Sequence, residues 1–467
     1  MVDVEKPLLA AAALLAFAVV WVFGPDAAAS QLQPPLRLVA DLPLGGSPSR
    51  FDALSLDAPQ HRLYVAHLGD GLVLAVDLRR HAVVDRIHVP GVHGVLAVPE
   101  LGRIFASATG VHELVTIDEK TGSVVARAPA GAYPDGIAYD AADEQLFVSD
   151  EHGGVEAVID ARSGRRVATV PLGGEAGNVQ YDPVSHVVVV AVQTRDALAV
   201  IDPGLRRVVR RKALPGCVHD HGLLLDPAGG VAFVACDGNS RLLVLDLRTL
   251  AVRGTQTVGS RPDMLAFDPL LRRLYVAAES GIVTVFAERG GSLRKLGGGF
   301  LAPGAHSVAV DPQTHLVYFP LANPGGRPIL RIMKPGSPTT GGPVGDGGAN
   351  LALPKLAAPG PWQLAGLGSA SGQRAVAQAH GRVVDPTKMA FAIAASPAQP
   401  LSVFWTVLCN DNIGDHEHTT SGMLRASAPL VRYPKLPPQF HPNGHCTLFV
   451  TAHLSGSGAA RIGIYGD

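Results

Sequence analysis

Short runs of alternating apolar and polar residues recur along most of this chain, and Gly, Asp and Pro turns separate them. Alternation with a period of two is typical of β-strands. Seven runs end in one register, on Asp57, Val98, Asp140, Asp182, Asp226, Asp268 and Asp311. These seven anchor positions are 41 to 44 residues apart, which is the length of one four-stranded propeller blade. The pattern therefore predicts an all-β, seven-bladed β-propeller.

The ends of the repeat region predict how the ring closes. Residues 37–46, RLVADLPLGG, closely match the outer strand RRVATVPLGG of residues 165–174, yet they precede the first blade. The last repeat shows only three strands before it runs into Gly and Pro. We expect the N-terminal strand to complete the last blade, because such pairing removes an open sheet edge.

The repeats also carry a family resemblance. LYVA occurs at Leu63 and Leu274 with variants in the other blades, VIDARSGRRVATV links a third strand to a fourth, and YPDG and RPDM form similar turns. Residues 36–335 thereby resemble the YVTN-repeat β-propeller family. The resemblance implies the fold but no single activity, because relatives include binding proteins, lactonases and metal-dependent lyases.

The rest of the chain divides into three parts. Residues 1–30 hold an apolar run followed by DAAAS, which predicts a signal peptide or an N-terminal anchor that would tether the protein to a membrane. Residues 336–373 are rich in Gly and Pro and are expected to be a linker. Residues 374–467 contain short apolar runs between turns, which predicts a small β domain, a sandwich of immunoglobulin-like type.

Composition narrows the functional classes. Apolar residues make up 47% of the 467 residues, charged residues 17%, and the formal net charge is -1. No basic stripe is present, so nothing indicates a nucleic-acid partner. The sequence also has no nucleophile elbow, P-loop, dinucleotide fingerprint or CxxCH haem motif. Common serine hydrolases, nucleotide enzymes and c-type cytochromes are therefore disfavoured.

Counting back five residues from each anchor gives one residue at the start of each innermost strand. The seven positions hold Asp52, His93, Asp135, Gly177, His221, Asp263 and His306. We expect them to surround one mouth of the central channel, with His67 and Asp150, ten residues after their anchors, nearby. The set could bind a small molecule, a peptide or a protein, or His93, His221 and His306 could hold a divalent or transition metal. Alternatively, the Asp and His side chains satisfy one another.

The C-terminal part offers a second candidate metal site. His416, His418, His441 and His445 stand in two short stretches, and imidazoles at close spacing suit copper or zinc. Most loops of this kind are simply solvated.

The four cysteines predict two disulfides in an exported chain, Cys217 with Cys236 and Cys409 with Cys446. Zinc bound by Cys217, Cys236 and His219 or His221 is the alternative to the first bridge.

The sequence thus favours an exported recognition protein, periplasmic, extracellular or on the cell surface, that presents a polar channel mouth on a rigid propeller. A metal-dependent lyase or lactonase acting at the ring of His and Asp is the alternative. A redox accessory protein that handles copper is a third hypothesis, which depends on the His clusters alone. No cofactor is certain at this stage.

Overall fold

A computed structural model describes residues 34–336 continuously and parts of the remainder, namely 351, 353–354, 363–373, 376–383, 389–410, 417–427, 430–433, 445–454 and 457–466. The expected signal or anchor segment, residues 1–30, lies outside the described residues. Within the described part, no helix has the length and apolar character needed to span a bilayer.

Residues 34–336 form seven four-stranded antiparallel sheets. Sheet one contains β2 (Leu54–Asp57), β3 (Arg62–His67), β4 (Leu72–Asp77) and β5 (Ala82–His88). Sheet two contains β6 (Val92–Val98), β7 (Arg103–Ala108), β8 (Glu113–Asp118) and β9 (Val124–Pro129). Sheet three contains β10 (Pro134–Asp140), β11 (Gln145–Asp150), β12 (Val155–Asp160) and β13 (Arg165–Pro171). Sheet four contains β14 (Ala176–Asp182), β15 (Val187–Val192), β16 (Ala197–Asp202) and β17 (Arg207–Ala213).

The remaining three sheets follow the same plan. Sheet five contains β18 (Asp220–Asp226), β19 (Val231–Cys236), β20 (Arg241–Asp246) and β21 (Val252–Thr257). Sheet six contains β22 (Pro262–Asp268), β23 (Arg273–Ala278), β24 (Ile282–Arg289) and β25 (Ser292–Phe300). Sheet seven contains β26 (Ala309–Asp311), β27 (Leu316–Leu321) and β28 (Ile329–Pro335), and its outermost strand is β1 (Leu36–Pro43), which pairs with β28.

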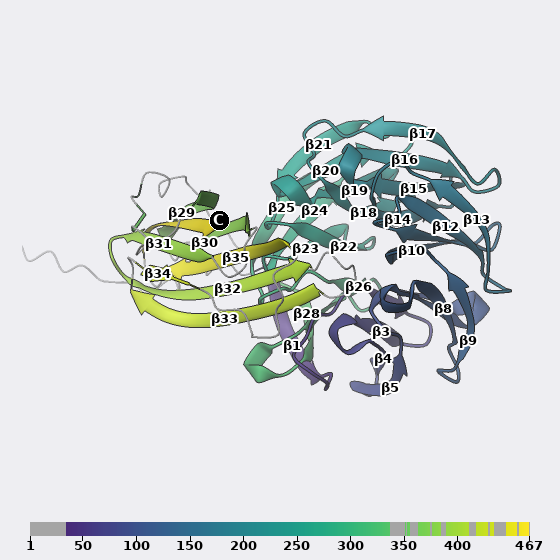
Figure 1. Ribbon diagram of the computed structural model, residues 1–467, viewed down its shortest axis with the longest axis horizontal. Coiled ribbons are helices and arrows are strands. Elements are labelled where there is room, and N and C mark those ends of the chain that lie inside the picture. The colour runs from purple at the N-terminus through teal and green to yellow at the C-terminus, as the bar shows by residue number, and fades with distance from the viewer. Residues whose placement is uncertain are drawn as a thin grey trace, which may run out of the picture.

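The sheets follow one another around a central axis (Figure 1). Each innermost strand contacts the innermost strand of the next sheet, and β26 of sheet seven also contacts β2 of sheet one. This is a β-propeller, so the all-β, propeller-type prediction is confirmed. Short 3-10 helices connect some strands, at Leu68–Asp70, Pro99–Leu101, Thr109–Val111, Gln193–Arg195, Asp237–Asn239 and Pro324–Gly326.

The repeated aspartates hold the turns between strands. Asp57 accepts the backbone N–H of Gln60 at 3.0 Å, and Asp140 accepts that of Ala142 at 2.9 Å. The aspartate at the end of a third strand binds the following turn in the same way, since Asp246 accepts the N–H of Thr249 at 2.7 Å. A carboxylate at a strand end satisfies the N–H groups of the turn that follows. The periodic Asp that defines the repeat in the sequence is therefore structural.

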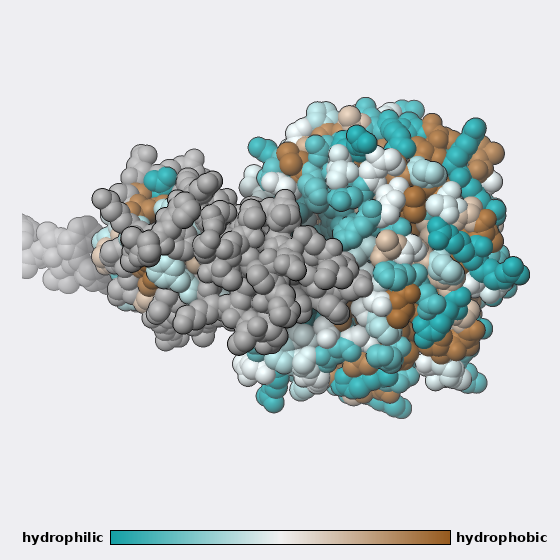
Figure 2. All heavy atoms as spheres, viewed as in Figure 1, coloured by the Kyte–Doolittle hydropathy of each residue, from teal (hydrophilic) through white to brown (hydrophobic). Residues whose placement is uncertain are grey.

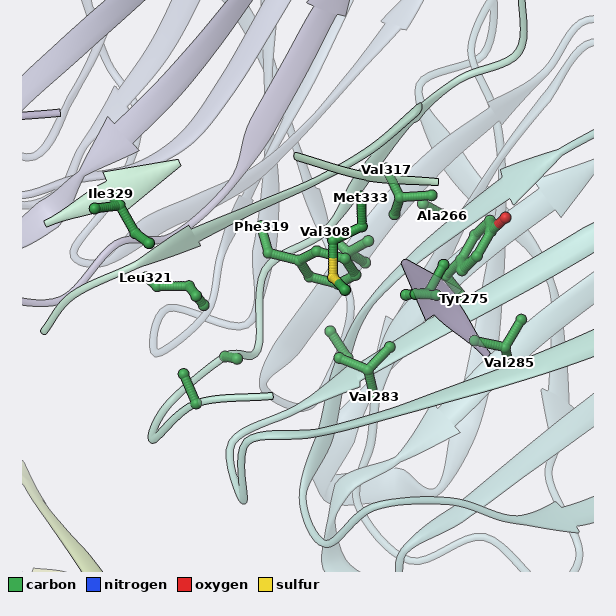
Figure 3. Close-up of a cluster of buried hydrophobic side chains, with 14 of the residues drawn as sticks. Ala266, Tyr275, Val283, Val285, Val308, Val317, Phe319, Leu321, Ile329 and Met333 are labelled. Atoms are coloured by element: carbon green, nitrogen blue, oxygen red, sulfur yellow. The ribbon is translucent and has the colours of Figure 1, made fainter. Parts of the chain in front are cut away.

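Apolar side chains fill the space between neighbouring sheets. Tyr275 and Val283 of sheet six pack against Phe319 of sheet seven, and Met333 of β28 joins them (Figure 3). Fully burying side chains of this size contributes about 1.5 to 3 kcal/mol each. Because every sheet buries both faces against its neighbours, the channel wall is held on a rigid frame. Figure 2 shows hydrophilic and hydrophobic residues intermixed over the visible face of the propeller.

Beyond the propeller, the described residues form two further four-stranded antiparallel sheets. One contains β29 (Gln363–Gln373), β36 (Ser457–Gly466), β31 (Ala390–Ser396) and β34 (Leu430–Arg432) in that order. The other contains β30 (Val376–Val383), β35 (His445–Leu454), β32 (Pro400–Asn410) and β33 (Glu417–Ser427). Buried side chains of both sheets, among them Phe391 and Val403, share one core.

One boundary differs from the sequence expectation. The strand β29 occupies the last eleven residues of the range 336–373, which was expected to be linker. Its sequence, QLAGLGSASGQ, is rich in Gly, Ala and Ser and shows no alternation of bulky apolar residues. Pairing with β36 makes it a strand without that pattern, because tertiary pairing overrides weak local preference.

Candidate functional site

A cavity of about 250 Å³ lies in the channel, where the innermost strands begin. Residues from six of the seven sheets line it. Its ionisable and polar lining residues are Arg50, Asp52, Ser55, His93, Tyr133, Asp135, Glu151, His152, Asn178, Gln180, Gln193, His219, His221, Asp237, Arg261, Asp263 and Glu279. Five of the ring residues expected from the sequence, Asp52, His93, Asp135, His221 and Asp263, are therefore brought together at this cavity.

Glycines let the inner strands approach closely enough to align these side chains. A Cβ on Gly222 would lie 2.0 Å from the carbonyl oxygen of Asp263, and a Cβ on Gly177 would lie 2.9 Å from that of His221. Only glycine fits at such contacts. Gly222 thus lets β18 lie against β22, which brings His221 beside Asp263.

The hydrogen bonds of His221 identify it as an imidazolium. The amide nitrogen of Gln193 donates to Glu151 at 2.8 Å and to the Ala176 carbonyl at 2.9 Å, so its Oε1 is an acceptor. This oxygen lies 3.0 Å from His221 Nδ1, and Asp263 Oδ1 lies 3.3 Å from His221 Nε2. Both ring nitrogens therefore donate. Although burial opposes the charge, the hydrogen bond to Asp263 and the nearby carboxylates raise the pKa of His221 to about 10.

His93 has protein partners at both ring nitrogens. Thr109 donates its hydroxyl to the Pro134 carbonyl at 2.6 Å and therefore accepts from His93 Nδ1 at 2.9 Å. His93 Nε2 lies 3.0 Å from the hydroxyl of Tyr133, with which it shares a hydrogen bond. Both nitrogens of the imidazole are therefore engaged. The Tyr133 ring also packs on His152, with ring centroids 4.2 Å apart.

A third cluster joins sheets one, six and seven. Arg50 Nη2 lies 2.7 Å from Glu279 Oε1, and His306 Nδ1 lies 3.3 Å from Glu279 Oε2. Burial alone would raise the pKa of Glu279, but Arg50 and His306 hold it well below its usual range. Burial and Arg50 oppose protonation of His306, yet Glu279 and Asp263 raise its pKa to about 8.

Two further carboxyl groups of the wall also have displaced pKa values. Burial raises the pKa of Asp52 to about 7; His93 and Arg50 lower it and Asp135 raises it. Burial and the nearby Asp135 also raise the pKa of Glu151. Such displaced pKa values arise where carboxyls are buried close together without enough positive charge.

Two residues expected at the mouth do not line the cavity. His67 is fully buried, stacks on Phe51 at 4.2 Å and accepts or donates a hydrogen bond with Ser49 at 3.0 Å. Asp150 accepts the backbone N–H of Tyr133 at 2.7 Å and that of Gly153 at 3.1 Å. Beside Asp150, the next residue, Glu151, takes the face toward the cavity, because side chains alternate along a strand.

The positions that do line the cavity lie one residue further on. Eleven residues after the anchors stand Glu151, Gln193, Asp237 and Glu279, all of them in the wall. Seven residues before the anchors stand Arg50, Tyr133, His219 and Arg261, which also line it. The sequence analysis missed most of these residues. The sequence does indicate these residues, because polar side chains recur at both positions, relative to the anchors, in four of the seven repeats.

The structure does not assemble the three expected metal-binding histidines. His93 and His221 use both ring nitrogens on protein partners, and only His306 belongs to a group with metal-site spacing. Among the described residues, that group is Asp263, Glu279 and His306. His416 and His441 lie outside the described residues, as do the side chains of His418 and His445.

The cysteine predictions have different outcomes. Cys217 and Cys236 form a disulfide with a Cα–Cα distance of 5.3 Å, which confirms that bridge and excludes the zinc alternative at these thiols. Cys409 and Cys446 stand opposite each other in the pairing of β32 with β35. Their side chains lie outside the described part, so the second bridge stays a prediction.

Comparisons with known proteins bear on the fold. No protein-family model and no curated protein sequence matches the chain. The structure is similar to a chain of Kuenenia stuttgartiensis hydrazine synthase, with a TM-score of 0.54 and 14% identity over 62% of this chain and 96% of that one. It is also similar to a chain in a crystal structure of the mitotic checkpoint complex, with a TM-score of 0.56 and 10% identity over 69% of this chain and 98% of that one. At such identities the similarity shows a propeller-type fold and nothing of the activity.

Proposed function

We propose that this protein is an exported binding protein whose propeller holds a small polar ligand with a cationic amine in the channel. The cavity of about 250 Å³, lined with charged groups, carries this proposal. Its volume suits a small molecule, and ligand sites are commonly concave with a few convergent polar groups.

The charge balance of the wall supports a cationic ligand. Six carboxyl groups line the cavity, namely Asp52, Asp135, Glu151, Asp237, Asp263 and Glu279, against the two guanidinium groups of Arg50 and Arg261 and the imidazolium of His221. Arg261 Nε lies 2.9 Å from Asp237, and Arg50 lies beside Glu279. Burial and the neighbouring Asp135 raise the pKa values of Asp52 and Glu151, so both carboxyl groups would gain from an added positive charge. An amine bound there would favour their ionised forms.

Thermal-shift measurements with panels of small amines, amino acids and neutral sugars test this function. An amine should stabilise the chelator-treated wild type, and Asp135→Asn and Glu151→Gln should remove that stabilisation. Lys120→Ala, at an exposed position away from the cavity, is the matched control. Affinity should rise from pH 6 to pH 8, because ligand binding releases the proton of Asp52. Stabilisation that survives both cavity variants would contradict the proposal.

Export is part of the proposal. A disulfide between Cys217 and Cys236 is in keeping with an oxidising compartment. Expression with the native residues 1–30 should place the protein outside the cytoplasm, and removal of that segment should keep it inside. Fractionation followed by mass measurement of the N-terminus distinguishes a cleaved signal from a retained anchor. We also propose membership of the YVTN-repeat family, which the LYVA strands support.

The alternative, a metal-dependent lyase or lactonase, draws support from the displaced pKa values of Asp52 and His221, since acid and base groups are tuned in this way. The hydrogen bonds of His93 and His221 count against a metal held by three histidines.

A further inference from the structure

We propose that Asp263, Glu279 and His306 form a binding site for a divalent transition-metal ion, with Zn²⁺ as the best match. The site goes beyond the proposed ligand-binding function and does not depend on it. It uses one histidine of the ring and two carboxylates, not the three histidines.

The spacing of the donor atoms is the first observation. One ligand atom from each of the three residues lies within 4.8 Å of the other two. Ligands bound to a single ion at about 2.0 to 2.2 Å stand at most about 4.4 Å apart. A small inward movement of the side chains is enough to share one ion.

His306 supplies the second and independent observation. Its side chain is 3% exposed, and its Nε2 atom is buried and has no hydrogen-bond partner. Its Nδ1 lies 3.0 Å from the Gly304 carbonyl, to which it donates. Metal-binding histidines usually donate one ring N–H to a carbonyl or carboxylate and keep the other nitrogen for the metal. A buried imidazole nitrogen without a partner costs stability unless something binds it.

Cationic neighbours hold the carboxylates of Glu279 and Asp263 in place. Arg50 holds Oε1 of Glu279 at 2.7 Å, and His221 holds Oδ1 of Asp263 at 3.3 Å. Each carboxylate therefore has one oxygen held by a cationic neighbour. The second oxygen of Glu279 lies 3.3 Å from His306 Nδ1 and would exchange this contact for the metal, and the second oxygen of Asp263 would be the other carboxylate ligand. Outer partners of this kind orient metal ligands.

The donor set selects the class of ion. One imidazole with two carboxylates suits Zn²⁺ and its first-row neighbours better than Ca²⁺ or Mg²⁺, which prefer oxygen alone. Three protein ligands leave at least one coordination position open. Asp263 and Glu279 line the cavity, so that position is available to a small molecule in the channel.

Calorimetric titration of the chelator-treated full chain with Zn²⁺ tests the site. Wild type should bind one equivalent that His306→Ala, Asp263→Asn and Glu279→Gln each weaken at least tenfold. His93→Ala is the matched control, since His93 has the same register and a similar Nδ1 contact with a carbonyl two residues earlier, at 3.1 Å. This variant should keep the wild-type affinity.

Co²⁺ absorption provides a readout besides affinity. The full chain should show d–d bands whose intensity falls in His306→Ala but not in His93→Ala. Because the ion displaces a proton from His306, affinity should rise between pH 6 and pH 8. Variants are compared only if their far-ultraviolet circular dichroism matches wild type, and His306→Gln replaces a misfolded alanine variant.

Two outcomes overturn the proposal. The first is wild type without a site tighter than about 100 µM. The second is unchanged affinity and Co²⁺ spectrum in all three ligand variants, whatever other ions the chain binds. Neither outcome bears on amine binding, which is measured in chelator-treated protein and depends on Asp135 and Glu151.

Discussion

His221 of sheet five and Asp263 of sheet six form an ion pair across two blades, with Nε2 and Oδ1 3.3 Å apart. Their side chains are 20% and 13% exposed, so water screens the pair only partly. Because His221 also donates to Gln193, one side chain links three consecutive blades at the cavity.

A double-mutant cycle measures this link. His221→Gln should lower the free energy of unfolding by about 2 kcal/mol, because it leaves the Asp263 carboxylate without its partner in a largely buried position. Asp263→Asn should have a similar effect, and the double variant should lose less than the sum of the two. Urea denaturation supplies the three values. Additive losses would show that the pair is not coupled.

The charge state of His221 has its own pH dependence. Its folded pKa of about 10 lies above the ordinary value of 6.5, so its contribution to stability is fully present below about pH 6.5 and is lost as pH rises through about 10. Nitrogen chemical shifts at pH 8 should show both ring nitrogens of His221 protonated. A neutral His221 at pH 8 would refute the assignment.

The disulfide should stabilise the loop that carries the site. Cys217 and Cys236 flank His219 and His221, and the bridge closes a loop of 19 residues. Replacing both cysteines with Ala should lower the free energy of unfolding by about 3 kcal/mol. A buried bridge should also resist mild reductant in the native protein, since Cys236 is fully buried. Thermal melts of oxidised wild type and the double variant test the first statement, and equal melting temperatures would contradict it. Thiol labelling of native wild type in mild reductant tests the second, and rapid labelling of Cys217 and Cys236 would contradict it.

Removal of β1 should affect the whole propeller. Leu42 and Leu44 are buried, and Arg331 of β28 forms a two-pronged ion pair with Asp41 at 2.8 and 2.7 Å. Deleting residues 36–46 should therefore lower the melting temperature of the entire ring rather than fray one end. Leu38→Ser, at an exposed position of β1, should change it little. A single unchanged transition in the deletion variant would show that β1 is dispensable.

The repeat period predicted much of the fold and the ring of Asp52, His93, Asp135, His221 and Asp263, because every blade presents the same register to the channel. It did not separate Asp150 from Glu151, where one residue decides which face a side chain takes. The repeat period could not predict which residues pair across the channel. Arg50 and Glu279, for example, are 229 positions apart and come from sheets one and six. A period predicts how far along the channel a residue lies, but not which residue of another blade it contacts.

The pairing of β1 with β28 constrains how the chain folds during its synthesis. Strand β1 finds its partner only when residues 329–335 have been made, so the ring stays open while six blades emerge from the ribosome. During that interval the edge of β28's sheet and the backbone groups of β1 have no partner in the ring. Closure is therefore a single late event, and a chain truncated before residue 329 lacks the strand that pairs with β1 and cannot close the ring.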